Sequence, residues 1–124
     1  MSSRPLLKPF KVVTDGDMSA SITSAPTIIT NTTMISYDIS WAGTAPVGTI
    51  SVEVSNTYSE NGQGEVANAG TWTPLTLSVT PSVSGNTGSG FISLTDLSAY
   101  AIRLVYTRGS GTGLLQVTLV GKVQ

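Results

Sequence analysis

Apolar and polar side chains alternate along much of the chain, and this alternation constrains the fold more than any other sequence feature. In residues 34–41 every second side chain, from Ile35 to Trp41, is a large apolar one, and Ser36, Asp38 and Ser40 lie between them. Because successive side chains of a strand point to opposite faces of a sheet, this pattern predicts a half-buried strand. Similar patterns predict strands at residues 48–56, 72–79, 90–97, 99–108 and 114–123, and weaker ones predict strands at 10–14, 18–22 and 26–30.

Glycine, proline and small polar residues separate these stretches. Residues 42–47 contain Gly43 and Pro46, and residues 109–113 read GSGTG, so we expect a short loop and a hairpin connection there. Residues 57–70 and 80–89 are longer polar stretches that we expect to be loops. About eight short strands without helical periodicity predict an all-β fold. We expect an antiparallel β-sandwich, of jelly-roll or immunoglobulin-like type.

A length of 124 residues fits a single domain, but charge is unevenly distributed along it. The first eleven residues contain Arg4, Lys8 and Lys11 and no acid, whereas the rest contains three basic and seven acidic residues. Pro5 and Pro9 disfavour a helix or a central strand in this segment. We therefore predict an extended basic N-terminal arm at residues 1–11, ahead of a sandwich domain at 12–124. The arm would reach a neighbouring subunit or pack on its own domain.

The residue types argue against catalysis. The chain has no Cys and no His, which removes thiol nucleophiles, thiolate metal sites and the usual general base. Asp38 and Glu53 point outward from adjacent expected strands. We interpret them as a solvated face, with Arg103 paired to one of them, rather than as a glycosidase carboxylate pair. No nucleophile elbow or phosphate-binding loop occurs. We predict no enzyme, no catalytic residues and no cofactor.

Two acidic pairs are candidate calcium sites: Asp15 with Asp17, and Glu60 with Glu65. Calcium takes about six to eight oxygen ligands, and neither pair has a third acid nearby, so we predict no metal site. Three basic residues in the arm are too few for a convincing nucleic-acid interface. The chain has no run of 18 apolar residues, so we expect no membrane-spanning helix.

The polar stretch at 57–72 is the candidate ligand or partner loop. Tyr58 and Trp72 flank it, and Asn61, Gln63 and Asn68 lie within it. Sugar sites combine an exposed aromatic ring with polar loop groups, so a carbohydrate- or surface-binding module is one hypothesis. In the alternative, Trp72 caps the end of the sandwich and Tyr58 ends the preceding strand.

Self-association is the other hypothesis, and it rests on the scarcity of charge. Charged residues make up 10% of the chain, compared with about 25% in an average soluble domain. A surface with few charges needs little desolvation when subunits meet and has little electrostatic protection against association. We therefore expect a homo-oligomer.

Four segments carry a resemblance to a class of known proteins. ISYDISW (35–41), GTISVEVSN (48–56), GTWTPLTL (70–77) and AYAIRLVYTRGSGTGLLQVTLVGK (99–122) resemble the small β-rich structural proteins of tailed bacteriophages. The resemblance is one of general style and carries over no functional residues. It implies a virion protein made in the host cytoplasm: a capsid decoration or cement protein, or a minor head or tail component. Its partners would be copies of itself and other virion proteins.

Overall fold

The computed structural model describes residues 6–29, 34–77, 82–95 and 99–122, and these residues form strands and no helix. No helix in this part of the chain is long and apolar enough to cross a membrane. The strands are β1 (Leu6–Asp17), β2 (Ile22–Thr23), β3 (Thr27–Ile28), β4 (Met34–Ser55), β5 (Ser59–Glu60), β6 (Val66–Asn68), β7 (Thr73–Pro74), β8 (Ser82–Val83), β9 (Thr87–Leu94) and β10 (Ala101–Lys122).

Eight of these strands form one antiparallel sheet, which confirms the predicted all-β antiparallel fold. The order is β1-β10-β4-β7, with β2 and β3 also paired to β10, and β8 and β9 also paired to β4. The strands β5 and β6 form a separate hairpin. The sandwich type is not confirmed, because the eight strands share one hydrogen-bonded sheet rather than the two separate sheets of a jelly roll or an immunoglobulin domain.

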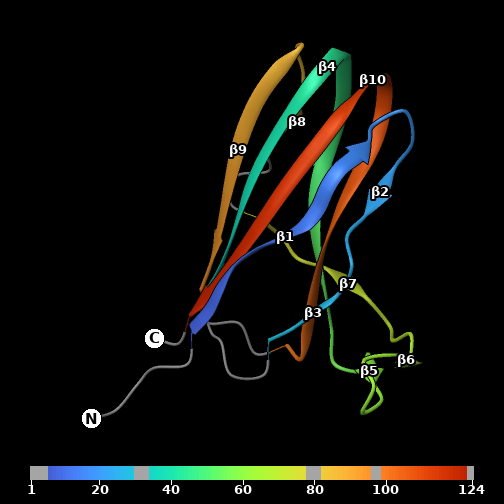
Figure 1. Cartoon of the computed structure of the whole chain (residues 1–124), viewed down its shortest axis with the longest axis vertical. Helices are drawn as coiled ribbons and strands as arrows, with labels where there is room; N and C mark the ends of the chain where they lie inside the picture. The colour runs from blue at the N-terminus through green and yellow to red at the C-terminus, as the bar shows by residue number, and fades with distance from the viewer. Residues whose placement is uncertain (1–5, 30–33, 78–81, 96–98, 123–124) are drawn as a thin grey trace.

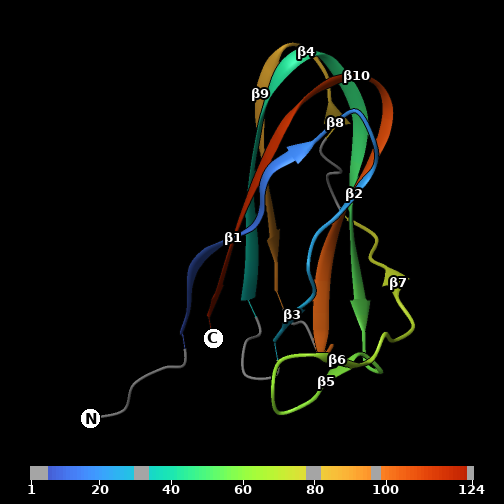
Figure 2. The same ribbon diagram turned by 45° about the vertical axis from the view of Figure 1, so that its right-hand side comes forward.

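Two long strands, β4 and β10, form the spine of the sheet. Each has 22 residues, and they pair antiparallel from Ala101 opposite Ser55 to Lys122 opposite Met34. Figures 1 and 2 show both strands arching together over one end of the molecule. The arch divides the sheet into a first half-sheet, ordered β1-β10-β4-β9, and a second half-sheet that contains β2, β3, β7 and β8 beside the other halves of β10 and β4.

The expected loop at 42–47 and the expected hairpin connection at 109–113 are both wrong. These residues lie inside β4 and β10, opposite one another: Gly43 pairs with Gly113, and Val47 pairs with Ser110. Neither strand folds back on itself, because each already has the other as its partner on both sides of the bend. Glycine and proline therefore mark a bend shared by two paired strands, not two reversals of the chain.

The bend depends on glycine at two points. Gly111 has a φ of +80°, a conformation that residues with a side chain rarely adopt, and a Cβ there would lie 2.0 Å from the carbonyl oxygen of Ala45. At Gly43 a Cβ would lie 2.3 Å from the Cα of Gly113. The register of the ladder shifts on either side of Ser110 and then resumes, which lets the two strands turn together.

The core lies between the two half-sheets and consists mainly of side chains that the alternation predicted to face inward. Trp41 is among them, as expected. The fully buried members include Ile35, Tyr37, Ile39, Leu115, Val117 and Leu119 from the first half-sheet, and Ile50, Val52, Val83, Ile102, Leu104 and Tyr106 from the second.

Part of the expected N-terminal arm belongs to the sheet. Residues 6–11 form the start of β1, which pairs with the end of β10 from Leu6 opposite Lys122 onward. For these residues the segment packs on its own domain, one of the two arrangements considered for it. Arg4 lies outside the described residues, and of Lys8 only the backbone is described.

Replacing Gly111 by Ala tests the bend, and Gly85→Ala is its matched control. Both glycines have φ near +80°, but a Cβ at Gly85 would meet only the carbonyl oxygen of Thr87, at 3.8 Å. Gly85→Ala should lower the free energy of unfolding by about 1–2 kcal/mol, the conformational term alone. Gly111→Ala should lower it by about 1–3 kcal/mol more, because backbone must move. Equal losses in denaturant titrations would contradict the proposed crowding at the bend.

Candidate functional site

The 57–72 segment, the expected ligand or partner loop, contains the β5–β6 hairpin at the end of the molecule opposite the bend (Figures 1 and 2). Asn61 organises its turn. The Asn61 Oδ1 atom accepts hydrogen bonds from the backbone nitrogens of Gln63 (2.8 Å) and Glu65 (3.0 Å), and its Nδ2 donates to Glu65 Oε1 (3.0 Å). Asn61 is exposed but already bonded, because its side chain replaces backbone contacts within the turn.

The base of the hairpin is tied to the end of β4. The Ser55 hydroxyl oxygen accepts hydrogen bonds from the backbone nitrogens of Thr57 (3.2 Å) and Tyr58 (3.1 Å). The Thr57 hydroxyl oxygen accepts one from the backbone nitrogen of Thr71 (2.7 Å). Asn68 Oδ1 likewise accepts from the backbone nitrogen of Gly70 (2.8 Å). Asn68 therefore shapes the chain where the hairpin returns toward the sheet.

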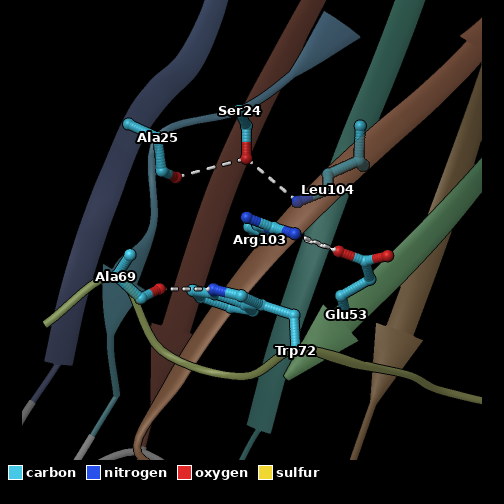
Figure 3. A network of polar contacts seen from close by, with 7 residues as sticks. All are labelled: Ser24, Ala25, Glu53, Ala69, Trp72, Arg103 and Leu104. Carbon is cyan, nitrogen blue, oxygen red and sulfur yellow. Dashed lines mark hydrogen bonds and ion pairs between the residues drawn. The ribbon is translucent and has the colours of Figure 1, made fainter. Parts of the chain in front are cut away.

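Trp72 stacks against the outer surface of the second half-sheet. The Arg103 guanidinium carbon lies 4.3 Å from the centroid of the Trp72 ring, within the range of a cation–π contact. Figure 3 shows the guanidinium lying between this ring and Glu53, whose Oε1 accepts from Arg103 Nε (2.8 Å) and Nη2 (2.7 Å). The Trp72 Nε1 donates to the carbonyl oxygen of Ala69 (2.9 Å).

Tyr58 completes this aromatic cluster. Its side chain is buried, and its ring centroid lies 5.7 Å from that of Trp72 at an interplanar angle of 52°. The Tyr58 hydroxyl donates to Glu60 Oε2 (2.5 Å). This hydrogen bond, and to a smaller extent burial, raises the pKa of Tyr58 to about 12, because the neutral phenol is the form that can donate to the carboxylate.

The structure thus brings together two of the five residues expected to form the ligand loop. Tyr58 and Trp72 are in contact, whereas Asn61, Gln63 and Asn68 lie exposed on the hairpin. Internal partners occupy the polar atoms of both aromatic side chains and one face of the Trp72 ring. A sugar would therefore find fewer free aromatic and polar groups than the sequence led us to expect.

The sequence indicated an ion pair for Arg103 but not its contact with the Trp72 ring. A pairing of Arg103 with Asp38 or Glu53 was expected, and the register of β4 and β10 places Glu53 directly opposite Arg103. Asp38 lies in the first half-sheet, on the other side of the bend, opposite Phe91 and Thr118. The two carboxylates once considered as a catalytic pair are therefore on different half-sheets.

The acidic pairs considered for calcium have protein partners. Asp17 Oδ1 accepts from the backbone nitrogen and the hydroxyl of Ser19 (2.9 and 2.7 Å), and these bonds hold the pKa of Asp17 below its ordinary value. Asp15 Oδ1 accepts from Gln116 Nε2, and Gln116 Oε1 accepts from Lys11 Nζ (3.1 Å). Within the described ranges, His, Cys, Asp and Glu form no group of three or more that could hold a metal ion.

A double-mutant cycle tests the Trp72–Arg103 contact. Trp72→Ala should lower the free energy of unfolding by about 1–3 kcal/mol, because the ring packs on both Arg103 and Tyr58. The cycle with Arg103→Ala should give a coupling free energy of about 0.5–1 kcal/mol. Val66→Ala, an exposed change in the same hairpin, should stay within about 0.5 kcal/mol of wild type. Fully additive losses, or glycan binding abolished by Trp72→Ala at unchanged stability, would contradict this structural role.

A spectroscopic titration tests the Tyr58–Glu60 bond. The difference in tyrosinate absorbance between wild type and Tyr58→Phe should report a group with a pKa of about 12 rather than 10. A pKa raised on folding stabilises the protein fully below pH 10, and this contribution is lost as the pH rises to about 12. Glu60→Gln should bring the pKa of Tyr58 back toward its ordinary value. An unchanged pKa in that variant would show that burial, not Glu60, dominates.

The chain is similar in fold to a solved structure. No protein-family model and no curated protein sequence match the chain. Among solved structures, the SPBc2 prophage-derived protein YomS is similar, with a TM-score of 0.50 and 8% sequence identity over 97% of this chain and 96% of that chain. At this identity the likeness concerns the fold, and it extends over nearly the whole length of both proteins.

Proposed function

We propose that the chain is a non-enzymatic structural protein of a bacteriophage particle that assembles through contacts between subunits. The observation that carries the proposal is the fold shared with a prophage-derived protein over nearly the full length of both chains. A capsid decoration or cement protein, or a minor head or tail component, fits this reading. In each case the protein acts mechanically, because area buried between subunits stabilises a shell or a joint.

The surface of the first half-sheet supports an assembly role. Its outward side chains on β4 and β9 are mostly small and uncharged, such as Ser36, Ser40, Ser89 and Ser93. Little charge must be desolvated when such a face meets another protein surface. Arg103 and Glu53 lie on the other half-sheet, where their charges pair with each other.

The carboxylates support a role without catalysis. A side chain that acts as a general acid or base must reach the substrate, and its own pKa must lie near the working pH. Glu53, Glu60, Glu65, Asp15 and Asp17 each accept hydrogen bonds or an ion pair from the protein itself. Their geometry is that of structural contacts, so we favour a structural protein over a hydrolase. We also favour it over the glycan-binding alternative at 57–72, because internal partners occupy the polar atoms of Tyr58 and Trp72.

The proposal is tested on phage particles. Particles released from an induced host and purified on a density gradient should contain the protein in a fixed ratio to the major capsid protein, measured by quantitative mass spectrometry. Deleting its coding sequence should yield particles that lack it and lose infectivity or integrity under heat or osmotic shock. Abundant protein in the lysate that is absent from purified particles would overturn the proposal.

A further inference from the structure

The two edges of the first half-sheet differ in how they are protected. The β1 edge carries Pro9, Lys11, Asp15 and Asp17, and its register with β10 shifts three times. Proline, charge and irregular register are the features by which proteins prevent edge strands from pairing with other chains. The β9 edge, Thr87–Leu94, has no proline, no charge and an unbroken register with β4. This edge lacks the protection that the opposite edge has.

Half of the backbone groups of β9 point away from the sheet. The backbone nitrogen of Gly43 donates to the carbonyl oxygen of Asn86 (2.7 Å), which identifies this pair as a hydrogen-bonded one in the β4–β9 register. Hydrogen-bonded and non-hydrogen-bonded pairs alternate in antiparallel sheets, so the NH and CO groups of every second residue from Thr87 face outward. These residues are Thr87, Ser89, Phe91 and Ser93. Among the described residues, only β4 pairs with β9.

The surroundings of β9 offer apolar surface to a partner. A groove of about 410 Å³ runs along the second half of the strand, between residues 76–77 and residues 91–95. On the outer face, the side chain of Phe91 is 64% exposed. It borders a shallow depression of about 210 Å³ that Met34 and Val120 also line. An exposed aromatic beside an unpaired edge is a combination that favours strand addition.

We propose that β9 pairs antiparallel with β9 of a second copy, about a two-fold axis through Gly90. This deepens the proposed function by naming the first subunit contact, and the partner follows from self-complementarity. Centring on Gly90 places Ser89 opposite Phe91 and Thr87 opposite Ser93, so every outward-facing residue finds a partner. The two Phe91 rings become diagonal neighbours on one face. No charge meets a like charge, because the strand has none.

Sedimentation velocity at increasing protein concentration tests the pairing. Two paired strands of eight residues form a contact at the small end of specific interfaces. The wild-type protein should therefore form a dimer with a Kd in the micromolar range. Ser89→Pro removes an outward NH while leaving the bonds to β4 intact, and Ser89→Lys adds a charge beside its symmetry mate. Each should raise the Kd about tenfold or more. Ser89→Lys alone decides the matter if the proline variant fails to fold.

The matched control is Ser40→Lys, because Ser40 lies opposite Ser89 on the neighbouring strand and faces the same side of the sheet. It adds the same charge one strand away from the edge and should leave the Kd within about threefold of wild type. A monomer at all concentrations up to about 1 mM would overturn the proposal. So would an oligomer that neither Ser89 variant weakens.

Cross-linking tests the register, since the chain has no cysteine of its own. Directly opposed residues of a hydrogen-bonded antiparallel pair have Cα atoms about 5.5 Å apart, within disulfide range. A mixture of Ser89→Cys and Phe91→Cys proteins should therefore oxidise to a mixed dimer faster than either variant alone. Equal rates in all three samples would overturn the Gly90-centred pairing.

The outcomes separate this inference from the proposed function. A dimer that Ser89→Lys dissociates, formed by a protein that is absent from purified particles, would overturn the function and leave the pairing standing. Incorporation of Ser89→Lys protein into particles at the wild-type level would overturn β9 pairing as the assembly contact while supporting the function.

Discussion

The rest of the structure depends on the backbone pairing of β4 with β10. Every other strand of the sheet attaches to one of these two: β1, β2 and β3 to β10, and β7, β8 and β9 to β4. The pairing also creates the core, because the two strands bend together and turn their apolar faces toward each other across the molecule (Figure 2). The glycines at the bend matter for this reason. They let two paired backbones turn at close approach without breaking the ladder that holds the sheet together.

The alternation predicted the buried faces of β4, β9 and β10, because they are local properties of the sequence. Within the described residues, the strands expected at 18–22 and 72–79 are reduced to β2 and β7, of two residues each. Residues such as Val52 and Val117 alternate with polar neighbours, and the structure buries them. The bend could not be predicted in this way. Gly43 and the GSGTG segment carry the signals of ordinary turns, and what makes them a shared bend is their pairing across some 70 residues of sequence. The same holds for Trp72. Its neighbour Arg103 is set by the register of two strands distant in sequence, so a ring interpreted as a ligand contact lies against a guanidinium.

The distribution of charge connects the fold to assembly. Arg103 and Glu53 neutralise each other beside the hairpin, and Lys11 and Asp15 are linked through Gln116 at the β1 edge. Internal contacts thus neutralise charge beside the hairpin and at β1. By contrast, β9 presents an exposed Phe91 and backbone groups that no described residue outside β4 pairs with. A protein with so few charges has weak general protection against association. In the pairing we propose, a regular uncharged strand at one edge gives association its specificity, because backbone geometry fixes the register of whatever pairs with it.

Amide hydrogen exchange in β9, followed by NMR at low and high protein concentration, tests the central claim that this edge is free in one copy and paired between two. At low concentration the amides of Ser89, Phe91 and Ser93 should exchange much faster than those of Gly90 and Ile92, which bond to β4. At high concentration the outward amides should become protected while the inward ones change little. Equal protection of both sets at low concentration, or protection that does not depend on concentration, would contradict the account.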